Sequence, residues 1–154
     1  DRKHPDALDL MRKGEVSFIV NVPTVSGGAV RDEDKEELVP VAKQLEEMGF
    51  TLFATPGTAD VIRSNGINVT TVYRINDRKH PDALDLMRKG EVSFIVNVPT
   101  VSGGAVRDGN MMRRLAVEMN IPFVTTMSGA KMEVLAIKAM REVDLVPMRL
   151  EVNY

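Results

Sequence analysis

Short apolar runs alternate along this chain with segments whose apolar residues have helical spacing. Segments 51–54, 69–75, 92–98 and 122–126 have the composition of strands, and segments 34–48, 58–64, 80–89, 110–119 and 130–142 have helical patterns. Strands that alternate with helices form a parallel sheet covered by helices. We therefore predict an α/β fold, a Rossmann-like or flavodoxin-like open parallel sheet of about five strands with helices on both faces.

Turn residues set the expected limits of these elements. Asp34 is predicted to be the N-cap of the first helix, and Pro40 should bend that helix. Glycine is frequent in residues 99–109, so we predict a loop there. Residues 143–154 alternate only weakly and are expected to form an extended tail.

A 32-residue segment occurs twice in the chain without a single difference, as residues 1–32 and again as residues 77–108. Three origins stay open: a recent duplication, deliberate engineering, or an artefact of sequence assembly. We divide the chain into an extra helix–strand piece (1–26, identical to 77–102), a main domain (27–148) and a C-terminal tail (149–154). An unpaired extra strand would seek a sheet edge, which suggests strand exchange between chains and a homo-oligomer.

Composition excludes several classes of protein. The net charge is -2, so no basic surplus indicates a nucleic-acid partner. The apolar runs are too short to span a membrane, and we expect a cytoplasmic protein. The chain has no cysteine, which excludes disulfides and thiolate metal sites. Because it does not begin with Met, we expect a piece of a larger protein.

One strand-to-helix turn has the composition of a phosphate site. In segment 54–60, Gly57 lets the backbone approach an anion, and Thr55 and Thr58 supply hydroxyl donors. The N-terminus of the following helix directs its N–H groups and positive dipole end to the same place. The alternative is an ordinary glycine turn with Thr58 as N-cap. The turn is not a Walker motif, because no Gly-Lys-Ser/Thr follows.

Other polar residues are expected at the same edge, because ligands of open α/β sheets bind beyond the carboxyl ends of the strands. Together they offer two cations and several neutral donors, which suits a phosphate monoester. They are Lys35, Arg74, Asn97, Thr125, Thr126 and Ser128.

Signs of catalysis are weaker. His4 and His80 are copies of each other, and each precedes a proline at a predicted helix start. Asp82 and Asp85 are expected to be helix N-terminal or exposed charges. No His/Asp/Glu spacing resembles a metal site, and no nucleophile elbow is present. We predict no catalytic residue, no metal and no cofactor.

Several spaced motifs resemble those of the methylglyoxal-synthase-like domain family, most closely the version at the C-terminal end of the large subunit of carbamoyl phosphate synthetase. The resemblance covers residues 29–142. The motifs are Val30–Glu37, Phe53–Ala59, Asn65–Ile67, Asp85–Gly90, Arg113–Ala116 and Ile121–Thr126.

In that family the domain is regulatory, so the resemblance implies allosteric binding of a nucleotide monophosphate, with UMP as inhibitor and IMP as activator in bacterial members. It also implies the rest of the synthetase large subunit as partner, in a cytoplasmic ATP-dependent ligase of pyrimidine and arginine biosynthesis. The implied phosphate ligands are Lys35, Thr55, Gly57, Thr58, Arg74 and Asn97, and the residues on the ribose or base side are Thr100, Asp108 and Met112.

This chain departs from the family pattern at a few positions. Ala29 stands where the family often has Ser, Arg74 replaces a lysine, and Val98-Pro99 follow Asn97 where regulated members tend to have hydroxyl residues. Two alternatives remain open. One is a phosphate-binding enzyme of the methylglyoxal synthase type, although the Asp-Pro after the fourth strand is absent. The other is an engineered, duplicated or strand-exchanged protein without retained ligand binding.

Overall fold

The computed structural model describes residues 17–21, 32–99 and 104–142. Among these residues, no helix has both the length and the apolar character needed to cross a lipid bilayer. The elements are β1 (Ser17–Asn21), α2 (Asp32–Glu47), β2 (Thr51–Ala54), α3 (Pro56–Ser64), β3 (Thr70–Thr71), the 3-10 segment η1 (Ile75–Asp77), α4 (Ala83–Arg88), β4 (Phe94–Asn97), α5 (Gly104–Glu118), β5 (Phe123–Val124) and α6 (Met127–Glu142).

The five strands form one sheet in the order β3-β2-β1-β4-β5, and all four pairings are parallel. This confirms the predicted α/β class with an open parallel sheet of five strands. From β1 the chain proceeds outward to β2 and β3, and then crosses back to β4 on the other side of β1. The strand order therefore reverses between β1 and β4, the place where open α/β sheets bind their ligands.

The strand from the first copy of the repeat lies at the centre of the sheet. β1 pairs with β2 on one side and with β4 on the other, and Phe18 lies opposite Phe94, its counterpart in the second copy. The expectation that this strand would seek a sheet edge is wrong. Phe18, Ile19 and Val20 are three successive apolar residues, so their side chains need cover on both faces, and the central position provides it most completely.

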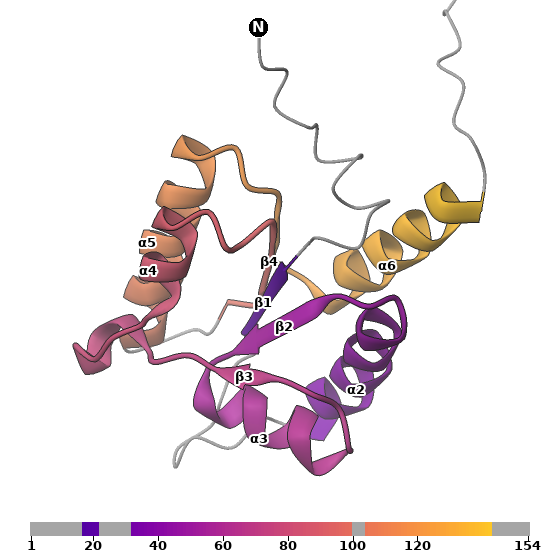
Figure 1. Cartoon of the computed structure of the whole chain (residues 1–154). Coiled ribbons are helices and arrows are strands. Elements are labelled where there is room, and N and C mark those ends of the chain that lie inside the picture. The colour runs from indigo at the N-terminus through magenta and orange to yellow at the C-terminus, as the bar shows by residue number, and fades with distance from the viewer. Residues whose placement is uncertain (1–16, 22–31, 100–103, 143–154) are drawn as a thin grey trace, which may run out of the picture.

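Two hydrophobic layers flank the sheet, as Figure 1 shows, with α2, α3 and α6 on one side and α4 and α5 on the other. β1 contributes to both layers, because Phe18 and Val20 point to the first and Ile19 to the second. The helices thus cover both faces, as predicted.

Helix α5 begins at Gly104, six residues before the predicted start at Asn110, so the predicted loop 99–109 is wrong from Gly104 onward. The two glycines lie where the helix passes close to polar side chains. A Cβ at Gly104 would lie 2.7 Å from Nδ2 of Asn76, and a Cβ at Gly109 would lie 2.8 Å from Nδ2 of Asn97. These glycines permit close packing and do not interrupt the helix.

Two other boundaries differ from the prediction. Asp34 lies inside the first turn of α2, which begins at Asp32, so Asp34 is not the N-cap. The third strand is reduced to Thr70–Thr71, and Ile75–Asp77 form a 3-10 turn. β3 pairs only with β2, so the pattern of β-branched residues between 69 and 75 extends beyond the residues that find a partner strand.

Candidate functional site at the carboxyl edge

The turn after β2 has the form predicted for a phosphate site. Thr55 is the N-cap residue of α3 in an extended conformation, Pro56 occupies the first turn, and the first turn has no acidic side chain. Gly57 and Thr58 are buried in this turn. Amide groups in the first turn of a helix have no acceptor within the helix and carry its positive dipole end. The turn therefore places two buried threonines and a positive helix end at the carboxyl edge.

Asn97 ends β4 at the same edge, in the centre of the sheet. Its side chain is 2% exposed, and in the register of the sheet it lies opposite Asn21, the last residue of β1. On the helix side, the close approach of Gly109 leaves little space around its amide group. Asn97 therefore places a buried amide group at the point where the strand order reverses.

The two predicted cations occupy partly buried positions. Lys35 lies in the first turn of α2, the helix that follows β1, and Arg74 immediately precedes η1. The parallel topology places the start of α2 at the same edge as Thr55 and Asn97. Arg74 lies close enough to Asp108 to act on the pKa of that carboxyl.

Asp108 is the most unusual polar residue near this edge. Its side chain is 8% exposed, and Oδ2 accepts a hydrogen bond from the backbone N–H of Asn76 at 3.2 Å. Oδ1 is buried without a hydrogen-bond partner among the described residues. Burial raises the pKa of Asp108, while the Asn76 N–H and the Arg74 charge oppose this effect. A buried carboxylate oxygen of this kind would gain from a donor supplied by a ligand.

Replacing Asp108 with Asn should stabilise the free protein. Because the pKa is raised in the folded state, folding favours the protonated form, and stability falls as the pH rises through the folded pKa. At neutral pH Asp108→Asn should therefore increase the free energy of unfolding by about 1 kcal/mol, since it removes a desolvated charge. Urea unfolding at neutral pH and below the ordinary aspartate pKa tests this. A variant less stable than the parent at neutral pH would contradict it.

The other two residues predicted on the ribose or base side have different positions. Met112 is buried among Ile95, Ala116 and other apolar residues of the α4–α5 layer, so its first role is in the core. Thr100 lies outside the described residues.

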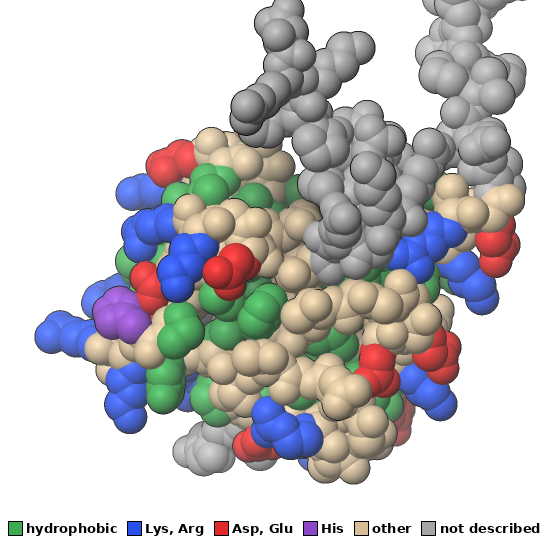
Figure 2. All heavy atoms as spheres, viewed as in Figure 1, with side chains coloured by type: hydrophobic (Ala, Val, Ile, Leu, Met, Phe, Trp, Pro, Cys, Tyr) green, Lys and Arg blue, Asp and Glu red, His purple; other side chains and the backbone are tan. Residues whose placement is uncertain are grey.

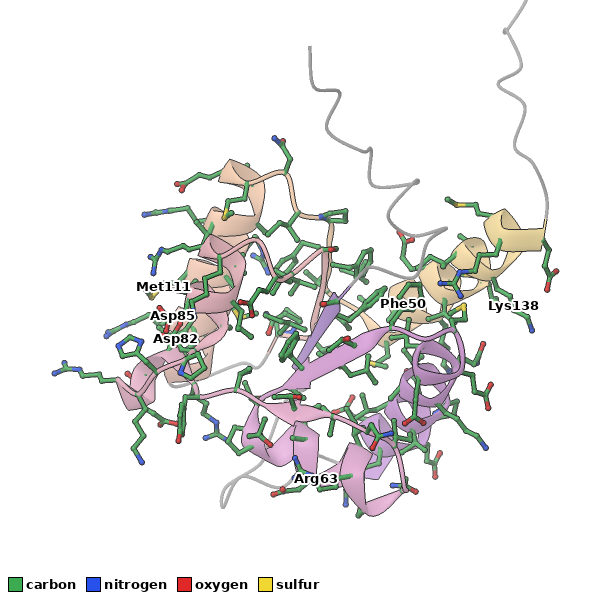
Figure 3. All side chains as sticks on the ribbon, viewed as in Figure 1. Phe50, Arg63, Asp82, Asp85, Met111 and Lys138 are labelled. Carbon is green, nitrogen blue, oxygen red and sulfur yellow. The ribbon has the colours of Figure 1, made fainter. Side chains whose placement is uncertain are left out.

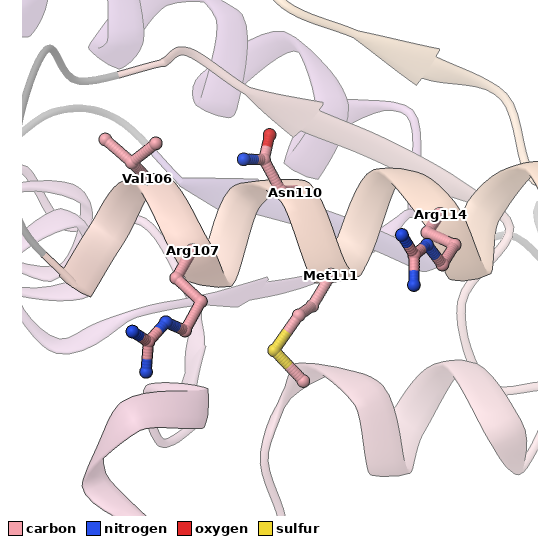
Figure 4. A pocket seen from close by; sticks show the side chains of 5 residues that line it. All are labelled: Val106, Arg107, Asn110, Met111 and Arg114. Atoms are coloured by element: carbon pink, nitrogen blue, oxygen red, sulfur yellow. The ribbon is translucent and has the colours of Figure 1, made fainter.

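A hollow of about 420 Å³ that was not predicted from the sequence lies on the outer face of α5, the side opposite Met112. Figure 4 shows Arg107, Met111 and Arg114 extending from one side of the helix. In Figure 2, Lys and Arg side chains gather on the same side of the molecule, over η1, α4 and α5. The spacing 107, 111, 114 is helical, so this signal was present in the sequence. Two guanidinium groups beside a methionine suit an anion with an apolar part.

His80, Asp82 and Asp85 form a cluster in which the possible ligand atoms all lie within 4.8 Å of one another. Nδ1 of His80 is 2.5 Å from Oδ2 of Asp85, and Figure 3 shows Asp82 and Asp85 side by side. The Asp85 side chain raises the pKa of His80. The hydrogen bonds from the Asp82 backbone and from His80 lower the pKa of Asp85. No metal site was expected from the sequence, and this cluster does not decide that expectation, because exposed acidic groups of this kind are common without a metal.

These carboxylates already have a structural role. The Asp82 side chain accepts from the Asp85 N–H, and the Asp85 side chain accepts from the Asp82 N–H, both at 2.9 Å. This is a capping box at the start of α4. It confirms the expectation that both residues serve at a helix N-terminus.

Asp82→Ala should therefore lower the free energy of unfolding by about 1 kcal/mol, the usual cost of losing an N-cap side chain. Asp60→Ala is the matched control, because Asp60 is exposed in α3 and forms a surface ion pair with Arg63 at 3.5 Å. Denaturant unfolding of both variants measures the difference. Equal stabilities would contradict a structural role for the capping box.

Comparison with known proteins gives consistent matches. A family model described as "MGS-like domain" matches residues 37–125. The chain is 43% identical to the "Carbamoyl phosphate synthase large chain, C-terminal section" of Methanocaldococcus jannaschii over 136 residues, which are 86% of this chain and 22% of that protein. It is 41% identical to the protein of the same description from Methanopyrus kandleri over 114 residues, 74% of this chain and 21% of that protein.

A third relative, the "Carbamoyl phosphate synthase large chain" of Thermoplasma acidophilum, is 38% identical over 102 residues, which are 66% of this chain and 10% of that protein. The chain thus spans about a fifth of the length of the first two relatives and a tenth of the third.

Proposed function

The chain belongs to the MGS-like domain family, and from this membership we propose that it is a regulatory domain that binds a nucleotide monophosphate and has no catalytic activity of its own. Its relatives are described as carbamoyl phosphate synthase large chains, which suggests that the domain serves such a synthase. The proposed ligand is UMP or IMP, and the proposed partner is the rest of the large chain.

The observation that carries the proposal is the unpartnered, buried Oδ1 of Asp108, considered within the described residues. Asp108 precedes Gly109, which lies against Asn97 at the reversal of strand order. A carboxylate oxygen accepts hydrogen bonds from hydroxyl groups, and a ribose offers two such hydroxyls. Oδ1 of Asp108, beside the predicted phosphate site, is thus an acceptor suited to the ribose of a nucleotide.

The phosphate would bind at the start of α3. The helix N-terminus, the hydroxyls of Thr55 and Thr58 and the amide of Asn97 would donate to its oxygens, as donors at helix N-termini commonly do. Lys35 and Arg74 would balance its charge from α2 and from the segment before η1.

Calorimetric titration of the chain with UMP, IMP and inorganic phosphate tests this proposal, with uridine and inosine as matched ligands that lack the phosphate. We expect saturable binding of a nucleotide, competition by phosphate, and much weaker binding of the nucleosides. Equal affinity for a nucleotide and its nucleoside would contradict a phosphate site, and no binding to the folded chain would overturn the proposal.

Regulation would follow from differential affinity. A nucleotide that binds one conformation of a synthase more tightly than another shifts the population toward that conformation. The proposal places this effect in pyrimidine and arginine biosynthesis, where the synthase supplies carbamoyl phosphate.

A second candidate function is a phosphate-binding enzyme of the methylglyoxal synthase type. The raised pKa of buried Asp108 favours it, because a general base works best with a pKa near the working pH. An assay for methylglyoxal release from dihydroxyacetone phosphate separates the two functions. A regulatory domain should show no turnover. If turnover is found and Asp108→Asn abolishes it, the chain is an enzyme and the regulatory proposal is wrong.

A further inference from the structure

Helix α6 has an apolar face that the described part of the chain leaves exposed. Met132 is 65% exposed and Leu135 is 55% exposed, and Ala136 and Ala139 are exposed beside them. The spacing 132, 135, 136, 139 places these four side chains on one stripe of the helix. An apolar stripe of this regularity is typical of a helix face that packs against another surface.

The opposite side of α6 is fixed to the body of the domain, so the exposed stripe has a defined position. Lys131 forms an ion pair with Glu37 of α2 at 3.2 Å. Near the other end, Arg141 donates to the Met48 carbonyl at 2.7 Å, and its guanidinium lies 4.6 Å from the centre of the Phe50 ring. Figure 1 shows α6 beside α2 in the same layer. Its buried face consists of Met127, Ala130, Val134 and Ile137.

We infer that Met132, Leu135, Ala136 and Ala139, here named the α6 stripe, form the surface on which the remainder of a carbamoyl phosphate synthase large chain packs. This inference rests on the proposed function. The aligned part of this chain corresponds to only 22% of the Methanocaldococcus jannaschii protein, so such a chain has ample surface to cover the stripe.

The size of the stripe favours a covalently joined partner over a second copy of this chain. Stable interfaces between separate proteins use roughly 20–30 residues on each side, whereas the α6 stripe has four. A segment of the same polypeptide has an effective concentration of about a millimolar, so a small contact is sufficient. The exposed Lys138 beside the stripe, which points away from the body in Figure 3, favours a carboxylate at the rim of the covering surface.

The stripe is also connected with the candidate ligand site. α6 begins at Met127, beyond the carboxyl end of β5, where the Gly129 N–H donates to Oγ1 of Thr126 at 3.0 Å. One rigid helix therefore runs from the carboxyl edge to the stripe. A nucleotide that moved the start of α6 would also move the docking surface.

The absence of cysteine in the sequence allows a direct test. Leu135→Cys places a thiol in the stripe, and Val117→Cys, at a 73% exposed position of α5, is the matched control. The rate of thiol modification is measured by mass spectrometry in the isolated chain at several concentrations. It is measured again after the chain replaces the matching segment of the Methanocaldococcus jannaschii protein.

We expect both thiols to react at similar rates in the isolated chain, and the thiol at 135 to react at least tenfold more slowly in the joined protein while that at 117 is unchanged. An unchanged rate at 135 in the joined protein would overturn the inference. Protection at 135 already in the isolated chain would also overturn it, indicating a second copy if it depends on concentration and this chain itself if it does not. Nucleotide titration of the Leu135→Cys chain tests the proposed function separately.

Discussion

Phe18→Ala is expected to lower the free energy of unfolding by about 3–5 kcal/mol, the usual cost of removing a buried aromatic side chain. Phe18 lies in the central strand and is almost completely buried. Its ring is 5.0 Å from the ring centres of both Phe50 and Phe94, so its loss would open a cavity between two aromatic neighbours. Denaturant unfolding followed by circular dichroism measures the effect.

The repeat supplies a matched control. Phe94→Ala makes the same change in the identical strand next to β1, and it should cost a similar free energy because Phe94 is buried in the same layer. Val117→Ala, on the exposed face of α5, should change stability by less than about 0.5 kcal/mol. If Phe18→Ala behaves like Val117→Ala while Phe94→Ala is destabilising, the first copy of the repeat is not part of the sheet.

Lys35→Ala and Thr55→Ala are each expected to weaken nucleotide binding, the first by about 10- to 100-fold. Hydrogen bonds to charged groups contribute about 1.5–3 kcal/mol, and each 1.4 kcal/mol changes affinity about tenfold. Lys35 would offer the phosphate a full charge from the first turn of α2, and Thr55 a neutral hydroxyl from the N-cap of α3, so Thr55→Ala should have the smaller effect. Calorimetric titration with UMP and IMP measures both.

Lys43→Ala controls for the loss of a positive charge from the same helix, because Lys43 is exposed two turns after Lys35. It should leave affinity within about twofold, since charges separated by solvent are screened. Equal losses for Lys35→Ala and Lys43→Ala would mean that α2 acts only through its overall charge, and the assignment of Lys35 would be wrong.

The fold class could be predicted from the sequence because apolar runs and helical spacing follow directly from the geometry of strands and helices. The position of β1 could not be predicted in the same way. A duplicated strand was expected at an edge, but its three successive apolar residues require cover on both faces, and this requirement prevailed. The start of α5 was missed because Gly104 and Gly109 indicated a loop, whereas they serve contacts with Asn76 and Asn97 from distant segments.

The candidate site was predictable to the extent that it depends on topology. Parallel strands place Thr55, Asn97 and the start of α2 at one edge, and sequence order alone leads to that expectation. The unpartnered Oδ1 of Asp108 could not be predicted, because it depends on how η1 packs against α5. In that packing the backbone N–H of Asn76 donates to Oδ2 and leaves Oδ1 without a partner among the described residues. Met112 was predicted on the ribose or base side of the ligand, and in the structure it is buried in the core.

A map of backbone amide chemical shifts during titration with UMP or IMP tests directly whether a nucleotide binds at the carboxyl edge. We expect the largest changes at the carboxyl edge, at Gly57, Thr58 and Asn97, while Gly66 and Gly90, which follow the C-terminal ends of α3 and α4, remain unchanged. Changes confined to the helix ends at Gly66 and Gly90, or to the outer face of α5 around Met111, would contradict this expectation.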